Sequence, residues 1–149
     1  MKRALLVASL WMAACGGSGL QPFTGSWKYA PGASLSYHCT STPPEFLDLQ
    51  GEVVALFEDG GALVATRNPD QHPPCTQTLE VKDGVATAQA GAPCPYDAGF
   101  LPTPIQISLP GETLTLSPDQ KSLFETGVGT ATVIGVSCPA AISGTLVKQ

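Results

Sequence analysis

The sequence predicts an all-β protein, an antiparallel meander of about eight to ten strands closed as a small barrel. Apolar and polar residues alternate with a period of two along most of the chain, and turns containing Gly or Pro separate these stretches. No stretch with helical periodicity reaches ten residues after the first 15. Connections this short leave no room for crossover helices, which favours a closed antiparallel barrel, with a β-sandwich as the alternative.

Four strands are expected in the first half of the chain, at residues 23–29, 33–40, 50–58 and 62–67. In the first two, every second residue is apolar or small, and Pro31-Gly32 forms the turn between them. The third strand is expected to have an inward row opposed by outward Glu52, the row being Gly51, Val53, Ala55 and Phe57. The fourth has apolar residues on both faces, so its orientation stays open.

Six more strands are expected at residues 75–81, 85–90, 105–109, 112–117, 129–138 and 142–148. The clearest hairpin turns at Asp83-Gly84, because this dipeptide readily supplies the positive φ that a tight turn requires. Pro110-Gly111 marks another turn. The proline-rich connection at residues 91–104 is the one long loop, and we expect it to pack over one mouth of the barrel.

Four cysteines follow residue 15, and an even number in an exported chain indicates two disulfides. In the hairpin register, Cys75 lies opposite about residue 91, which brings it close to Cys94. The favoured pairs are therefore Cys75 with Cys94 and Cys39 with Cys138. The alternative joins Cys39 to Cys75 and Cys94 to Cys138. Zinc is disfavoured because the chain has no Cys-x-x-Cys pair.

The first fifteen residues have the pattern of an export signal. Lys2 and Arg3 precede an apolar run, and small residues lead to Cys15. This resembles a bacterial lipoprotein signal peptide with its lipobox, which implies cleavage after residue 14 and attachment of acyl chains such as palmitate to Cys15. An unlipidated secretory signal is the alternative. A retained transmembrane helix is disfavoured because the run is well short of ~20 residues.

The resemblance also indicates where the protein resides. Gly16 follows the cysteine instead of the Asp that commonly retains lipoproteins at the inner membrane, which implies a lipid anchor in the outer membrane of the cell envelope. Residues 1–14 would form the signal peptide, 15–22 the lipidated cysteine with a flexible tether, and 23–149 one all-β domain. After the leader, five Lys and Arg oppose twelve Asp and Glu, a formal charge of −7, so no basic nucleic-acid footprint is present.

The first expected strand contains Gly25-Ser26-Trp27. This is similar to the Gly-x-Trp signature of lipocalin-like barrels, in which the Trp plugs the closed end and the Gly lets the chain pass close beside it. The resemblance implies a ligand cavity lined by Trp27, Tyr29 and Tyr37. A late Arg over the Trp also belongs to that family, whereas the one Arg after the leader is Arg67, in mid-sequence.

No catalytic residue is assigned. His38 lies on an expected polar face and His72 just before two prolines, so neither is placed as a general base. The acidic pair Asp48 and Glu52 is expected to be solvated, and no nucleophile elbow, zinc-binding helix or phosphate loop occurs. These observations indicate a protein without enzymatic activity, cofactor or metal.

Two functions compete. In the first, the barrel binds a small apolar ligand in its interior. In the second, the lipoprotein binds a protein, for example as an inhibitor of an envelope-active hydrolase, through a loop made rigid by a disulfide and prolines, with Pro93, Pro95 and Tyr96 as contact residues. A purely structural envelope protein is a further alternative.

Overall fold

The computed structural model describes residues 19–40, 42–70, 74–99 and 101–149. Within these ranges the chain is all-β, as predicted, and forms twelve strands. They are β1 (Gly25–Tyr29), β2 (Ser34–Tyr37), β3 (Glu45–Asp48), β4 (Val53–Asp59), β5 (Ala62–Arg67), β6 (Cys75–Lys82), β7 (Val85–Ala88), β8 (Cys94–Tyr96), β9 (Ile105–Ser108), β10 (Thr113–Leu116), β11 (Ser122–Val133) and β12 (Val136–Lys148). No helix in this part of the chain has the length and apolar character needed to cross a membrane. The predicted signal peptide and Cys15 lie outside the described residues.

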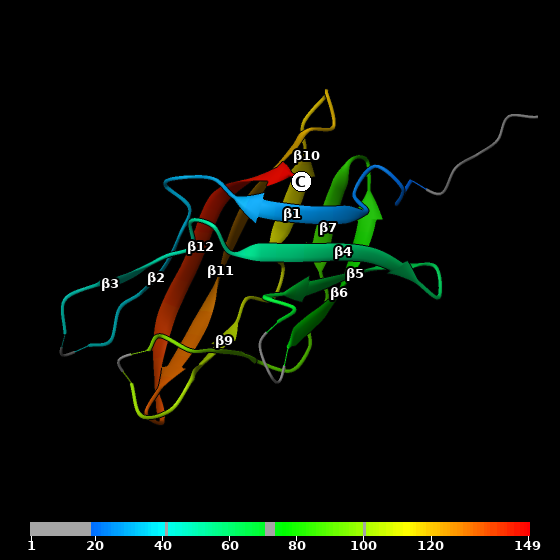
Figure 1. The fold of residues 1–149 in the computed structure, drawn as a ribbon. Coiled ribbons are helices and arrows are strands. Elements are labelled where there is room, and N and C mark those ends of the chain that lie inside the picture. The colour runs from blue at the N-terminus through cyan, green and yellow to red at the C-terminus, as the bar shows by residue number, and fades with distance from the viewer. Residues whose placement is uncertain (1–18, 41, 71–73, 100) are drawn as a thin grey trace, which may run out of the picture.

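Eight of the strands close into an antiparallel barrel, in the order β12, β1, β4, β5, β6, β7, β10 and β11, with β11 pairing back onto β12. The predicted barrel is therefore present. Two excursions interrupt the meander: β2 and β3 are inserted between β1 and β4, and β8 and β9 between β7 and β10. In Figure 1, β2 and β3 lie to one side of the two long strands β11 and β12, below β1.

The β11–β12 hairpin explains where the extra strands attach. β12 pairs with β1 through residues 146–148 and with β2 through residues 140–143. β11 pairs with β10 through residues 123–126 and with β9 through residues 130–132. Half of each long strand thus belongs to the barrel and the other half carries the additional strands, so the sheet continues beyond the barrel.

The prediction of one strand over residues 129–138 is wrong. The chain reverses at Ile134-Gly135, where both residues have positive φ, 47° and 79°, and Val133 pairs with Val136. A β-branched residue rarely adopts positive φ, so the sequence pattern concealed this turn. The preceding residues 122–128, to which no strand was assigned, form the first half of β11.

The predicted orientation of the third strand is also wrong. Val54 and Leu56 are buried in β4, whereas Phe57 is 44% exposed. Apolar residues occupy both alternating rows of this strand, so alternation alone does not decide which row faces the core. The inward row contains Glu52, which period-two reasoning had placed on the outside.

Both disulfides form as the favoured pairing predicted. Cys39 bonds to Cys138 and Cys75 bonds to Cys94, with Cα–Cα distances of 4.7 and 5.0 Å. The β6–β7 hairpin has a two-residue turn at Asp83-Gly84, both with positive φ, and its register places Lys82 opposite Val85. The Cys39–Cys138 bond ties the chain after β2 to the start of β12, and the Cys75–Cys94 bond ties β6 to β8.

Candidate functional site

A cavity lies at one end of the barrel, where β5 ends and β6 begins, and the additional strands β2, β8 and β9 contribute to its wall. The empty space amounts to about 570 Å³ when space open to solvent is included, but only about 50 Å³ is accessible to the centre of a water molecule. Apolar residues of β2, β4, β9 and β12, and of the loops that directly follow β3 and β9, form one part of the wall, and these are Leu35, Leu49, Val53, Ile107, Leu109 and Ile142. The other part is polar and contains charged groups.

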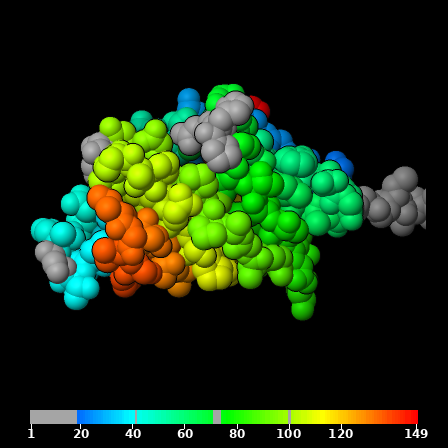
Figure 2. All heavy atoms as spheres, turned by 90° about the horizontal axis from the view of Figure 1, so that it is seen from below, coloured from blue at the N-terminus to red at the C-terminus, as the bar shows by residue number. Residues whose placement is uncertain are grey.

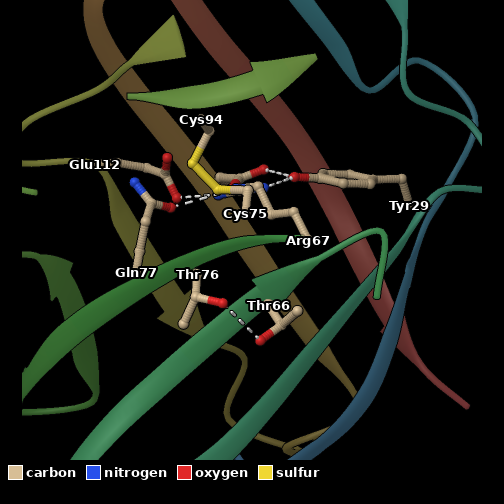
Figure 3. Close-up of a disulfide and its surroundings, with 9 residues drawn as sticks. Tyr29, Thr66, Arg67, Cys75, Thr76, Gln77, Cys94 and Glu112 are labelled. Carbon is tan, nitrogen blue, oxygen red and sulfur yellow. Dashed lines mark hydrogen bonds and ion pairs between the residues drawn. A yellow bond between two sulfur atoms is a disulfide. The ribbon is translucent and has the colours of Figure 1, made fainter. Parts of the chain in front are cut away.

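Arg67, at the end of β5, is the centre of the polar wall. Its Nη2 donates hydrogen bonds to Glu112 Oε1 and, over 2.5 Å, to Glu125 Oε1. Its Nη1 donates to the hydroxyl oxygen of Tyr29, which in turn donates to Glu125 Oε2 over 2.5 Å. Its Nε donates to Gln77 Oε1 over 3.4 Å. In Figure 3, Arg67 lies between Tyr29 and Glu112, beside the Cys75–Cys94 disulfide.

Both glutamates are almost completely buried, with Glu112 at 1% and Glu125 at 0% exposure. Buried carboxylates are stable only where a counter-charge and hydrogen bonds replace water. Arg67 supplies the counter-charge to both, and Tyr29 adds a hydrogen bond to Glu125. We call Tyr29, Arg67, Glu112 and Glu125 the Arg67 cluster.

One acceptor in the cluster has no partner. Glu112 Oε2 is buried and makes no hydrogen bond within the described part of the protein. The position of Glu112 depends on Gly127 of β11, where an added Cβ would lie 3.0 Å from Glu112 Cβ. Because Gly127 has no side chain, the Glu112 side chain can occupy this space.

The pKa shifts in the cluster follow from burial and charge. Burial raises the pKa of Glu112 to about 8, because it outweighs the attraction of Arg67 and is reinforced by the charge of Glu125. Burial alone would lower the pKa of Arg67, but the charges of Glu112 and Glu125 hold it above its ordinary value. Burial also raises the pKa of the Tyr29 hydroxyl, so it remains protonated and able to donate.

A second polar group closes the cavity from the other side. Glu52 accepts hydrogen bonds of 2.8 Å from the Tyr96 hydroxyl and the Asn68 amide. Tyr96 belongs to β8, within the long connection that the sequence placed over one mouth of the barrel. Pro95 and Tyr96 do line the cavity. In Figure 2, which views the molecule from below, this yellow-green segment lies between the orange β11–β12 hairpin and the green strands.

The structure brings together some of the predicted site residues and separates others. Tyr29 lines the cavity, but Trp27 and Tyr37 are buried elsewhere in the core, and neither belongs to the cavity wall. Pro93 is exposed, whereas Pro95 is half-buried. Tyr96 was expected to contact a protein partner from this loop. Its side chain is half-buried, and its hydroxyl donates a hydrogen bond to Glu52.

Sequence reasoning missed the Arg67 cluster, although two signals pointed to it. Glu112 has the same parity as Leu114 and Leu116, which the sequence placed inward. Glu125 has the same parity as buried Leu123, but no strand was expected there. Arg67 ends a strand with apolar residues on both faces, so its direction required the structure. His38 is exposed, and His72 lies outside the described residues.

Comparison with known proteins adds little to this description. No family model matches the chain, and no curated protein matches it either. A solved structure with a distant likeness is a protein of unknown function from the DUF3598 family of Nostoc punctiforme PCC 73102, at 11% sequence identity and a TM-score of 0.36. The match covers 87% of this chain and 48% of that chain, so this chain spans about half the length of that protein. A likeness at this level carries no argument about function.

Proposed function

We propose that the protein is a non-enzymatic lipoprotein of the outer membrane that binds a small ligand in its β-barrel. The observation that carries the proposal is the cavity, which combines an apolar wall with the buried Arg67 cluster. Such a combination suits a molecule with an apolar body and one polar end, because apolar side chains supply affinity and a few convergent polar groups supply orientation.

The size of the cavity limits the ligand. Space of about 50 Å³ for water centres holds a molecule of only a few non-hydrogen atoms. A long acyl chain does not fit in this volume, because the barrel core is filled by side chains such as Phe23, Trp27 and Leu63. The proposed ligand is therefore a short amphipathic molecule rather than a fatty acid.

Calorimetric titration tests ligand binding directly. The full-length protein in a non-ionic detergent is titrated with n-butylamine, butyrate and butan-1-ol, which share one apolar body. Ile107→Phe, which enlarges a buried side chain in the cavity wall, should abolish binding of whichever compound binds. Val136→Phe, on a residue that is 55% exposed, should not. Absence of binding by all three compounds would reject the ligand-binding function.

The lipid anchor is tested separately. Growth with a radiolabelled fatty acid should label the wild-type protein but not Cys15→Ala, and the labelled protein should fractionate with the outer membrane. An unlabelled wild-type protein would refute lipidation and leave the unlipidated secretory signal as the alternative.

A second candidate function, binding of a protein, is favoured by an apolar row on the outer face of the sheet. Phe46, Ser36, Ala141 and Val128 are successive cross-strand neighbours on β3, β2, β12 and β11. Phe46 and Val128 are 70% and 72% exposed, and no residue of the row is charged. Exposed apolar side chains on a flat, uncharged sheet face are typical of protein contact surfaces.

Site-specific photocrosslinking separates this candidate from the first. A photoreactive residue in place of Phe46 should give a discrete protein adduct in intact cells. The same residue in place of Thr78, an exposed position on β6, should not. Equal labelling from both positions would reject a docking surface at the row.

A further inference from the structure

The Arg67 cluster has one unused hydrogen-bonding position, and it is an oxygen of a buried carboxyl group. Glu112 Oε2 is buried without a partner, and Glu112 lines the cavity. Buried carboxyl oxygens without a hydrogen-bond partner are rare in native proteins, so this one requires an explanation. A ligand that donates a hydrogen bond to this oxygen would supply the missing partner.

The guanidinium of Arg67 is already engaged by other groups. Its Nη2 contacts both glutamates, its Nη1 contacts Tyr29, and its Nε contacts Gln77. These contacts use four of the five N–H groups of the guanidinium, so a ligand carboxylate could take a second N–H only by displacing one of these partners. The bidentate contact that normally recognises a carboxylate is therefore blocked in this cavity.

The charges around the cavity also favour a cation. Glu112 and Glu52 line the wall, and Glu125 binds the same guanidinium as Glu112. The surroundings of the cavity thus hold three carboxyl groups and one arginine, and Coulomb attraction in a site with little water favours a positive ligand over a negative one. The pKa of Glu112 is raised to about 8 mainly by burial, and the charge of Glu125 adds to the rise.

We propose that the cavity binds the ammonium group of a small primary amine, with Glu112 Oε2 as its main acceptor and the apolar wall around its alkyl chain. This inference rests on the proposed ligand-binding function and names the chemical class of the ligand. A bound ammonium favours ionised Glu112, so binding near neutral pH releases a proton from the carboxyl group. The charged and titratable groups that face Glu112 are Arg67 on β5, Glu125 on β11 and Tyr29 on β1.

The test uses the three compounds of the previous subsection at pH 7. We expect n-butylamine to bind the full-length wild type at least tenfold more tightly than butyrate or butan-1-ol. The measured heat of n-butylamine binding should depend on the ionisation enthalpy of the buffer, because the buffer takes up the proton that Glu112 releases. Glu112→Gln removes the charge but retains the shape, and should weaken amine binding at least tenfold and abolish the proton release. Glu80→Gln, on an exposed carboxylate of β6, is the matched control.

The outcomes separate the two proposals. Tighter binding of butyrate or butan-1-ol than of the amine would overturn the amine proposal and leave a ligand-binding barrel. Binding by none of the three compounds would overturn both. Equal amine affinity in Glu112→Gln and in wild type would show that Glu112 is not the acceptor and overturn the inference. If Glu112→Gln does not fold, the wild-type ranking of the three compounds and the proton release decide the question.

Discussion

The ammonium nitrogen of Lys148 lies 5.2 Å from the centroid of the Trp27 ring, and the two residues are register partners on β12 and β1. Trp27 is fully buried, and its indole nitrogen donates to the carbonyl oxygen of Phe23 over 2.7 Å. A Cβ at Gly25, whose φ is 133°, would lie 3.1 Å from Lys148 Cε. The glycine therefore leaves room for the Lys148 side chain to lie against the Trp27 ring.

This contact predicts a spectroscopic change. Trp27 is the one tryptophan after residue 15, so in protein that lacks residues 1–14 its emission reports this position and should be blue-shifted. Lys148→Gln should shift the emission to the red and lower the free energy of unfolding by about 0.5–1 kcal/mol, because a cation–π contact is lost. Lys28→Gln, on exposed Lys28 of β1, is the control. Identical spectra of Lys148→Gln and wild type would contradict the contact.

The second prediction concerns the buried ion pairs. Arg67→Met removes the counter-charge of buried Glu125 and the hydrogen-bond donor of buried Glu112, and should lower the free energy of unfolding by about 3–5 kcal/mol. Adding Glu112→Gln and Glu125→Leu should restore most of the loss, since the buried carboxyl groups left without Arg67 are then removed. Urea unfolding measures each difference, with exposed Lys82→Met as the control. A triple variant no more stable than Arg67→Met would argue against charge as the cause.

The third prediction is a dependence of stability on pH. The folded-state pKa of Glu112, about 8, lies above its ordinary value of 4.5, so the folded protein binds more protons than the unfolded chain between these values. The free energy of unfolding of wild type should therefore fall, relative to that of Glu112→Gln, as the pH rises from about 4.5 to 8, by up to about 1.4 kcal/mol per pH unit. Urea unfolding at pH 5, 6.5 and 8 measures the difference. Parallel curves for the two proteins would show that Glu112 titrates normally.

The fourth prediction compares the two disulfides. The bonds span 19 and 99 residues, and the chain-entropy model assigns about 3 kcal/mol to the shorter loop and nearly 5 kcal/mol to the longer one. Replacing Cys39 and Cys138 by alanine should therefore destabilise the protein more than replacing Cys75 and Cys94. Only the second replacement should increase hydrogen exchange in β8, because Cys94 anchors that strand beside the cavity. The reverse pattern of exchange would contradict this role.

The fifth prediction uses the turn that the sequence pattern concealed. Ile134 is 64% exposed and has a φ of 47°, so its side chain adds little to the core while its backbone is disfavoured. Ile134→Asn places the preferred Asn-Gly pair in the β11–β12 turn, and should raise the free energy of unfolding by about 1 kcal/mol. Thr132→Asn, in β11 of the same hairpin, should not stabilise. Thermal unfolding checks both, and a destabilised Ile134→Asn would exclude strain at this turn.

Alternation and turn chemistry in the sequence determined the fold class, most strand positions and both disulfides. Period two identifies half-buried strands because one row of side chains meets the core and the other meets solvent. The Asp83-Gly84 turn determined the hairpin that brings Cys75 close to Cys94. In β4 both rows of side chains are apolar, so alternation cannot decide which row faces the core. At Ile134 the turn uses a residue that is unusual in turns, so the sequence pattern does not locate it.

Only the tertiary structure decided the candidate site. Arg67, Glu112 and Glu125 are separated by up to 58 residues and each looks like a surface charge when considered alone. Closure of the barrel places β5, β10 and β11 around one interior, where each of these charges is stable because the others replace water. Burial of a charge is a property of the group of side chains that surrounds it, so no alternation within one strand can reveal it.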